Sequence, residues 1–486
     1  MGDYWDGLWL VRLVFQRGLA AIYLVAFVGA LNQFPALLGE KGLLPACQFV
    51  RRAPFRSAPS LFHWRCTDGF ARALAWLGIL LSVAALTGLS EQGPMLLSAA
   101  TWVAMWLLYL SFVNVGQEFY AFGWESMLLE AGFLAAFLGP AHTQPSLIPV
   151  LALRWMLFRT ELGAGLIKIR HDACWRDLTC MYYHYETQPL PNPISIYFHR
   201  LPKSVHRLSV VFSHFVQLVT PFGLFAPQPV AAIAAGFIIV HQLLLIVSGN
   251  YSWLNWLTVV LGISGLSDHV LRIVVPVAAG TLDPRSSFHE LVLYAFAAVV
   301  LLLSIQPALN LVSRRQVMNH SYNPLHLVNA YGAFGSVTKE RYEVVLEGTD
   351  EESVTAATKW REYEFKAKPG RVTRRPPQIA PYHLRLDWLM WFLPFSVAVT
   401  PRGILLPGHE IWSLRLVQRL LAGDRATLKL LGENPFPDRP PRFLRARYYL
   451  YRMATSEERR QTGGYWERTS VGEYLPPTGG PAVADL

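Results

Sequence analysis

Long apolar segments recur along the first two thirds of the chain and predict transmembrane helices. A helix needs about 20 apolar residues to cross a bilayer. The candidate spans are 18–37, 73–90, 94–113, 126–140, 147–167, 208–226, 229–248, 252–266 and 289–306, with a short or re-entrant piece at 269–280 that Pro276 interrupts. Several lie near the lower length limit, so we expect seven to ten spans. Backbone groups in lipid must be paired internally, so the spans should form a helix bundle.

After about residue 311 the pattern changes to that of a soluble domain. Short segments with strand-type alternation or β-rich composition are interleaved with amphipathic helical patterns that end at glycines. The expected elements are strands at 341–347, 360–368 and 443–453, and helices at 411–422 and 426–431. The Gly/Pro-rich composition after residue 462 predicts disorder.

The sequence therefore predicts three parts. Residues 1–310 form a multi-pass transmembrane helix bundle, residues 311–462 a small soluble β-rich α+β domain, and residues 463–486 a disordered tail. The predicted fold class is a membrane all-α bundle followed by an α+β C-terminal domain.

Composition supports the membrane assignment and excludes one class of partner. Hydrophobic residues make up 52% of the chain and charged residues only 16%, whereas soluble domains carry about a quarter charged residues. The net charge of +10 has its commonest explanation in Lys and Arg at membrane boundaries, and no nucleic-acid-binding motif accompanies it. Two basic loops, 38–72 and 168–207, fall on the same side when spans are counted. The positive-inside rule assigns that side to the cytoplasm.

Three charged residues recur every seven positions inside one candidate span: Arg154, Glu161 and Lys168. Seven residues make nearly two helical turns, so these side chains share one stripe, roughly 10 Å apart. Charges facing lipid are costly, so the stripe must face the bundle interior, a wet cavity or a partner. It is either a polar functional site, with Glu161 paired to Arg154 or Lys168, or a structural ion-pair ladder. A functional role is favoured only for Lys168.

Two carboxylates form a second polar cluster. Glu125 sits at the expected start of a helix, where a negative charge suits the positive end of the helix dipole. Glu130 lies about one turn deeper and is expected to partner Arg154 or Arg159. No spacing of His, Cys or carboxylate residues makes a metal site, and no cofactor is expected.

The cysteines and two asparagines add further candidate sites. Cys174 and Cys180 are six residues apart. This separation is compatible with a disulfide but does not by itself predict one. Four cysteines in all, including two in the first long loop, do not make a disulfide framework. Asn250 and Asn319 match the glycosylation pattern; Asn319 is a candidate only if its domain is lumenal in a eukaryotic cell.

Many short motifs spread over nearly the whole chain resemble the lipase maturation factor family. They include Phe122-Gly-Trp-Glu-Ser126, Gly163-Ala-Gly-Leu-Ile-Lys-Ile-Arg170, Tyr183-His-Tyr-Glu-Thr-Gln-Pro189, Gly249-Asn-Tyr-Ser252, Tyr331-Gly-Ala-Phe-Gly335, Arg385-Leu-Asp-Trp388 and Asn434-Pro-Phe-Pro437. The resemblance implies a multi-pass membrane protein that assists folding or assembly of immature secreted client proteins, such as lipases. It implies the endoplasmic reticulum membrane with a lumenal C-terminal domain in eukaryotes, and the cytoplasmic membrane in a bacterium.

A fainter resemblance bears on mechanism. Ala164-Gly-Leu-Ile-Lys168 followed by Trp175 is similar to a segment of the membrane domain of vitamin K-dependent carboxylase, with a spacing that differs by a residue or two. A lysine serves as base there, which implies Lys168 as a base, with Glu161 or Glu130 tuning its charge.

Three hypotheses follow from the sequence. The first is a non-enzymatic maturation factor whose C-terminal domain binds clients through strand edges or aromatic patches. The second is a membrane-embedded enzyme that uses Lys168 as its base. The third is a redox helper that uses Cys174 and Cys180.

Overall fold

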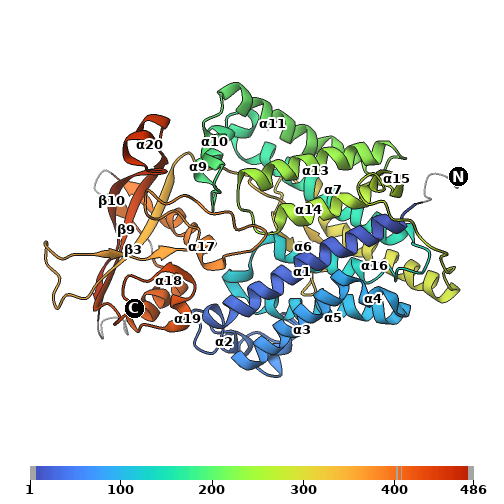
Figure 1. The fold of residues 1–486 in the computed structure, drawn as a ribbon, viewed down its shortest axis with the longest axis horizontal. Coiled ribbons are helices and arrows are strands. Elements are labelled where there is room, and N and C mark those ends of the chain that lie inside the picture. Colours follow the sequence, from blue (N-terminus) through green and yellow to red (C-terminus); the bar gives the residue numbers. More distant parts are fainter. Residues whose placement is uncertain (1–6, 401–402, 407, 480–486) are drawn as a thin grey trace.

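In a computed structural model, helices occupy one part of the molecule and a β-rich domain stands at one end of them (Figure 1). The structure describes residues 7–400, 403–406 and 408–479. Their apolar side chains form one large core that runs from the helices into the C-terminal domain.

Among the described residues, five helices are long and apolar enough to cross a membrane. They are α1 (Trp9–Leu37), α3 (Asp68–Thr87), α5 (Met95–Asn114), α13 (Val230–Ser248) and α16 (Ser287–Val312). By length and composition, these five are fewer than the seven to ten spans expected from the sequence.

The other predicted spans are helices that pack among these five. Three are shorter than the roughly 20 residues that a span needs, and α7 is long enough but carries too many charges. They are α6 (Gly123–Ala135), α7 (Leu147–His171), α11 (Lys203–Leu218) and α14 (Leu254–Gly262). The segment 269–280 contains only the end of a one-turn helix. The remaining short helices are α2 (Ala46–Val50), α4 (Leu89–Gln92), α8 (Ala173–Arg176), α9 (Met181–Thr187), α10 (Ser195–His199), α12 (Thr220–Gly223) and α15 (Asp268–Leu271).

The outer surface of the helices is apolar. On α16, Leu301 and Leu302 are 71% and 68% exposed, and on α13 Ile233 is 57% exposed. Soluble monomers rarely expose contiguous apolar surface on this scale. The protein is therefore an integral membrane protein whose outer helix faces contact lipid.

The C-terminal domain is built on a four-stranded antiparallel sheet with the order β10-β9-β3-β4. Its strands are β3 (Arg341–Thr349), β4 (Arg361–Glu362), β9 (Phe443–Met453) and β10 (Trp466–Gly479). The predicted strands at 341–347 and 443–453 correspond to β3 and β9, which pair with each other along the whole of β3. The domain also contains four helices, α17 (Arg385–Met390), α18 (Ile411–Leu421), α19 (Arg425–Leu428) and α20 (Ser456–Thr462). Two further strand pairs are β1 (His320–Ser321) with β2 (Asn329–Ala330), and β6 (Ala398–Thr400) with β7 (Gly403–Leu405).

The predicted strand at 360–368 is interrupted. It becomes β4 and a separate short strand β5 (Glu364–Phe365), which pairs with β8 (Leu431–Glu433). Beyond β5, the backbone amides of Ala367 and Lys368 donate to the carboxylate of Asp387, at 2.6 and 3.1 Å. These donors are therefore used by a side chain instead of a neighbouring strand.

The prediction that residues 463–486 are disordered is wrong for most of this segment. Residues 466–479 form β10, which pairs with β9 from Trp466–Met453 to Gly479–Phe443. Trp466 and Leu475 are buried in the domain core. Two prolines are tolerated because β10 is an edge strand, where missing backbone donors cost little. Residues 480–486 lie outside the described part of the chain.

Both basic loops touch the C-terminal domain, so they lie at the same end of the helices (Figure 1). Arg415 of α18 donates to the carbonyl oxygen of Leu43 in the first loop (2.9 Å), and Trp391 donates to that of Thr187 in the second (3.0 Å). Arg341 of β3 reaches deeper, donating to the carbonyl oxygens of Gln188 and Pro189, at 2.5 and 3.0 Å.

Candidate functional site

The charged stripe of α7 is buried as expected, but its members do not pair with one another. Arg154, Glu161 and Lys168 are only 2%, 1% and 6% exposed. Arg154 donates to two backbone carbonyl oxygens, those of Ser264 (2.7 Å) and Leu224 (3.1 Å). The expected pairing of Glu161 with Arg154 is therefore corrected, because Arg154 instead ties together the ends of two neighbouring short helical segments.

A glutamine stands between the other two charges. Gln217 of α11 donates through Nε2 to the Glu161 carboxylate (3.2 Å) and accepts through Oε1 from Lys168 Nζ (2.8 Å). Gln242 of α13 donates a second hydrogen bond to Glu161 (2.7 Å). Lys168 also donates to Ser213 Oγ (3.3 Å). The expected direct pairing of Glu161 with Lys168 is corrected, since amides satisfy the carboxylate.

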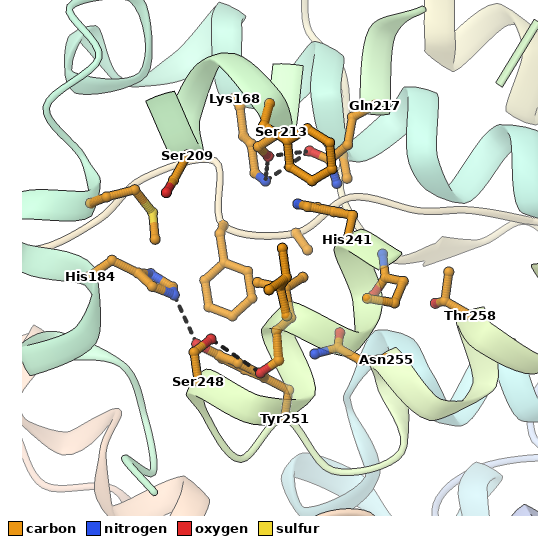
Figure 2. Close-up of a pocket in the computed structure, with 18 of the residues that line it drawn as sticks. Lys168, His184, Ser209, Ser213, Gln217, His241, Ser248, Tyr251, Asn255 and Thr258 are labelled. Carbon is orange, nitrogen blue, oxygen red and sulfur yellow. Dashed lines mark hydrogen bonds between the residues drawn. The ribbon is translucent and has the colours of Figure 1, made fainter. Parts of the chain in front are cut away.

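Lys168 and Glu161 border a cavity of about 290 Å³, whereas Arg154 does not. The cavity lies between α7, α11, α13 and α14, closed at one end by α9 and by residues 333–334. In Figure 2, Lys168, Ser213 and Gln217 gather on one side, and the imidazole of His241 points toward the same space. The other labelled polar residues around the cavity are His184, Ser209, Ser248, Tyr251, Asn255 and Thr258.

The far side of the cavity is held by a chain of hydrogen bonds. The Tyr251 hydroxyl donates to Gln188 Oε1 (2.5 Å), so it accepts from His184 Nε2 (2.8 Å). Burial, reinforced by the nearby charge of Lys168, lowers the pKa of His184 to about 3. The imidazole is therefore neutral, and it positions Tyr251 without adding charge.

Lys168 has the contacts of a charged ammonium. Besides its two hydrogen bonds, Nζ lies 4.6 Å from the centre of the Trp175 ring, within cation–π range. A free amine acting as a base would need its lone pair directed at a substrate. With two donated bonds and a ring contact, the side chain is arranged to hold a positive charge at the cavity wall.

Glu130 is not part of this cavity. It forms a buried ion pair with Arg159 of α7, one of the two partners expected for it. Its carboxylate also accepts from the Tyr331 hydroxyl (2.7 Å) and Asn329 Nδ2 (3.0 Å). The suggestion that Glu130 tunes Lys168 is corrected, because this carboxylate instead fastens the segment that leads into the C-terminal domain.

Glu125 has a role that the sequence did not reveal. It lies in the first turn of α6 as expected, but its carboxylate pairs with Arg385 of α17 at 2.6 Å. The Tyr109 hydroxyl donates to the same carboxylate (2.5 Å), and Arg385 also donates to the carbonyl oxygen of Phe119 (2.7 Å). Nothing local marks this pair, since its members are 260 residues apart.

His383 lies beside this pair and predicts a pH dependence. Burial lowers its pKa to about 4 from 6.5, so at intermediate pH the unfolded chain binds a proton that the folded protein does not. Stability should fall as pH drops from about 6.5 to about 4, by up to about 3 kcal/mol. Melting temperatures between about pH 7 and pH 5 should depend less on pH in His383→Gln. His320→Gln, at an exposed site, is the control; equal slopes in all three proteins would contradict the assignment.

Both cysteine pairs are disulfides. Cys174 is joined to Cys180, with Cα atoms 4.8 Å apart, and Cys47 is joined to Cys66 in the first loop. Cys174 and Cys180 are 6% and 0% exposed and pack with Trp175. Such a buried bond presents no thiol to a client, which favours a structural role over the redox hypothesis.

The two glycosylation candidates differ in access. Asn250 is 1% exposed; its Nδ2 donates to the carbonyl oxygen of Pro377 (2.9 Å) and its Oδ1 accepts from the amides of Ile379 and Ala380, at 2.9 and 3.0 Å. A glycan cannot occupy that space, so Asn250 is corrected to a structural residue that holds the C-terminal domain. Asn319 is exposed and stays a prediction.

Two family models match the chain, one over each part. The lipase maturation factor transmembrane domain matches residues 10–273, and the lipase maturation factor C-terminal domain matches residues 327–476. Lipase maturation factor 1 of Bos taurus is 42% identical over 96% of this chain and 89% of its own length, and that of Homo sapiens is 42% identical over 96% and 88%. Lipase maturation factor 2 of Homo sapiens is 28% identical over 98% and 84%. No solved structure matches.

Proposed function

Because the chain belongs to the lipase maturation factor family, we propose that it is a membrane-anchored maturation factor for secreted proteins, with lipases as clients. The supporting observation is the 42% identity to lipase maturation factor 1, which spans 96% of the chain. The similarity therefore includes both the membrane part and the C-terminal domain.

An aromatic patch on the C-terminal domain is the proposed client contact. It consists of Trp391, Phe392 and Phe395, whose rings pack on one another with centroids 4.6 to 5.8 Å apart. Phe392 and Phe395 are 41% and 50% exposed. Trp391 and Phe395 also border a second cavity of about 290 Å³ between the domain and the 184–189 segment. Exposed aromatic side chains of this kind suit contact with apolar segments of an incompletely folded chain.

We further propose that this end of the molecule faces an oxidising compartment. Both disulfides lie in loops at the end that carries the C-terminal domain. Disulfides persist in the endoplasmic reticulum lumen or bacterial periplasm and are rare in the cytoplasm. The cytoplasmic assignment from basic loops is weaker, since the second loop is long and well structured. The proposed location is the endoplasmic reticulum membrane, or the cytoplasmic membrane in a bacterium.

Rescue of lipase secretion in cells lacking their own factor tests the proposal. The wild-type chain should restore active secreted lipase, and Phe392→Ser/Phe395→Ser should lower it at least about tenfold, since losing a binding hot spot costs about 2 kcal/mol. Phe55→Ser, at a 47% exposed phenylalanine of the first loop, is the matched control. No rescue by the wild-type chain at normal expression would refute the maturation role. Full rescue by the double variant would refute only the patch.

A further inference from the structure

We propose that the cavity bordered by Lys168 is a binding site for a single-chain lipid with an anionic head group, of which a long-chain fatty acid is the simplest. The site is distinct from the aromatic patch proposed for clients. The inference stands on the charges, the unpartnered groups and the opening of the cavity.

The first argument is the charge of Lys168. Its ammonium is buried, yet within the described part of the chain its contacts are all neutral: Ser213, Gln217 and the Trp175 ring. Glu161 lines the same cavity, but the side chain of Gln217 lies between the two charges, so the carboxylate makes no direct contact with the ammonium. Burying a charge is costly unless it is paired. An anionic head group beside Lys168 would supply the missing partner.

The second argument is an unused polar group next to Lys168. His241 is 5% exposed, and its Nδ1 is buried with no hydrogen-bond partner among the described residues. Buried polar atoms are nearly always satisfied, so each exception calls for an explanation. Its imidazole points into the space that Lys168 faces (Figure 2). A bound carboxylate can accept from both residues.

The third argument is the apolar end of the cavity. Phe198, Phe212 and Leu245 form part of its wall, and the Phe212 ring packs against the His241 imidazole. Leu201, Val205 and Leu244 also line it, and they are 38%, 38% and 47% exposed on the outer surface. These residues belong to the segment before α11, to the first turn of α11 and to α13.

The opening therefore lies on the outer surface of the helices, beside the exposed Lys203 and Arg207 and next to apolar faces of α11 and α13 that contact lipid. Leu208 of α11 is next in sequence to the lining residue Ser209, and Leu243 of α13 lies between the lining residues Gln242 and Leu244. These two leucines are 66% and 44% exposed. A ligand would enter from the membrane, place its head at Lys168 and leave its chain between α11 and α13. The volume of about 290 Å³ lies at the lower limit of small-molecule sites, roughly 300–1,000 Å³. This size suits a head group with the upper part of one chain.

Photolabelling of the full-length protein in phosphatidylcholine nanodiscs tests the site. A diazirine-bearing palmitate should label peptides of α11 and α13, and unlabelled oleate should compete. Oleyl alcohol, which has the same chain and no charge, should compete at least about tenfold more weakly, because bonds to a charged group are worth about 1.5–3 kcal/mol. Equal competition by the alcohol would overturn recognition of an anionic head group.

Two variants locate the site independently. Lys168→Met removes the charge at similar length and should reduce labelling at least about tenfold. Val205→Trp fills the opening and leaves Lys168 in place, and it should reduce labelling by blocking entry. Lys203→Met removes an exposed lysine of α11 that does not line the cavity, and should leave labelling unchanged. Unchanged labelling in Val205→Trp, or loss of labelling in Lys203→Met equal to that in Lys168→Met, would overturn the proposal.

Discussion

Replacing Arg385 with methionine is expected to destabilise the folded protein by about 3–5 kcal/mol. Arg385 and Glu125 are 1% and 0% exposed and lie 2.6 Å apart. The guanidinium also stacks over Tyr120, 3.4 Å from the ring centre. Removing it leaves the Glu125 carboxylate buried without a counter-charge. The shift in the denaturation midpoint of the purified protein measures the effect.

Two further variants separate this explanation from a general loss of packing. Glu125→Gln/Arg385→Met removes both charges and should recover part of the lost stability, because an uncompensated buried charge is the main cost. Arg460→Met breaks an ion pair whose side chains are 76% and 64% exposed, and should change stability by about 0–1 kcal/mol. A double variant less stable than Arg385→Met would contradict the electrostatic explanation.

Truncation after residue 312 is expected to prevent accumulation of a folded helix bundle. The fragment 1–312 keeps Glu125 but loses Arg385, and it keeps Glu130 but loses Tyr331. It also exposes apolar surface that belongs to a core shared with the C-terminal domain. We therefore expect the two parts to fold as one unit, despite their different composition. The yield of monodisperse protein in detergent is the measurement.

A charge-neutral version of the fragment tests the reason. Glu125→Gln within 1–312 should raise the yield above that of the unmodified fragment, because the amide does not carry the uncompensated charge. The same substitution in the full-length chain should lower stability, since it removes the partner of Arg385. A fragment 1–312 that unfolds at the wild-type midpoint would show that the bundle is independent.

Local patterns determined much of the secondary structure. The long apolar runs correspond to helices, and the predicted strands at 341–347 and 443–453 correspond to β3 and β9. The helix expected at 411–422 is α18. These features depend on the periodicity of apolar residues, which is visible in short stretches of consecutive positions. The burial of the charged residues could also be predicted from the sequence, because a charged residue in an apolar span must face inward.

The partners of those charges were decided by the tertiary structure. The seven-residue spacing placed Glu161 and Lys168 on one stripe, but the amide of Gln217, from a helix about 50 positions later, stands between them. Glu125 and Arg385 meet only because α17 packs against the start of α6. Side-chain partners depend on how helices rotate and pack, and sequence periodicity does not specify this.

The same reason explains the tail and Asn250. The composition of 463–486 indicated disorder, yet β9 offers a free edge on which residues 466–479 complete the sheet. The pattern around Asn250 indicated glycosylation, yet the backbone at 377–380 folds over it. The sequence by itself determined which segments are helices or strands and which charges must be buried. Only the tertiary structure decided which residues each helix, strand and buried charge contacts, because those contacts join residues far apart in the chain.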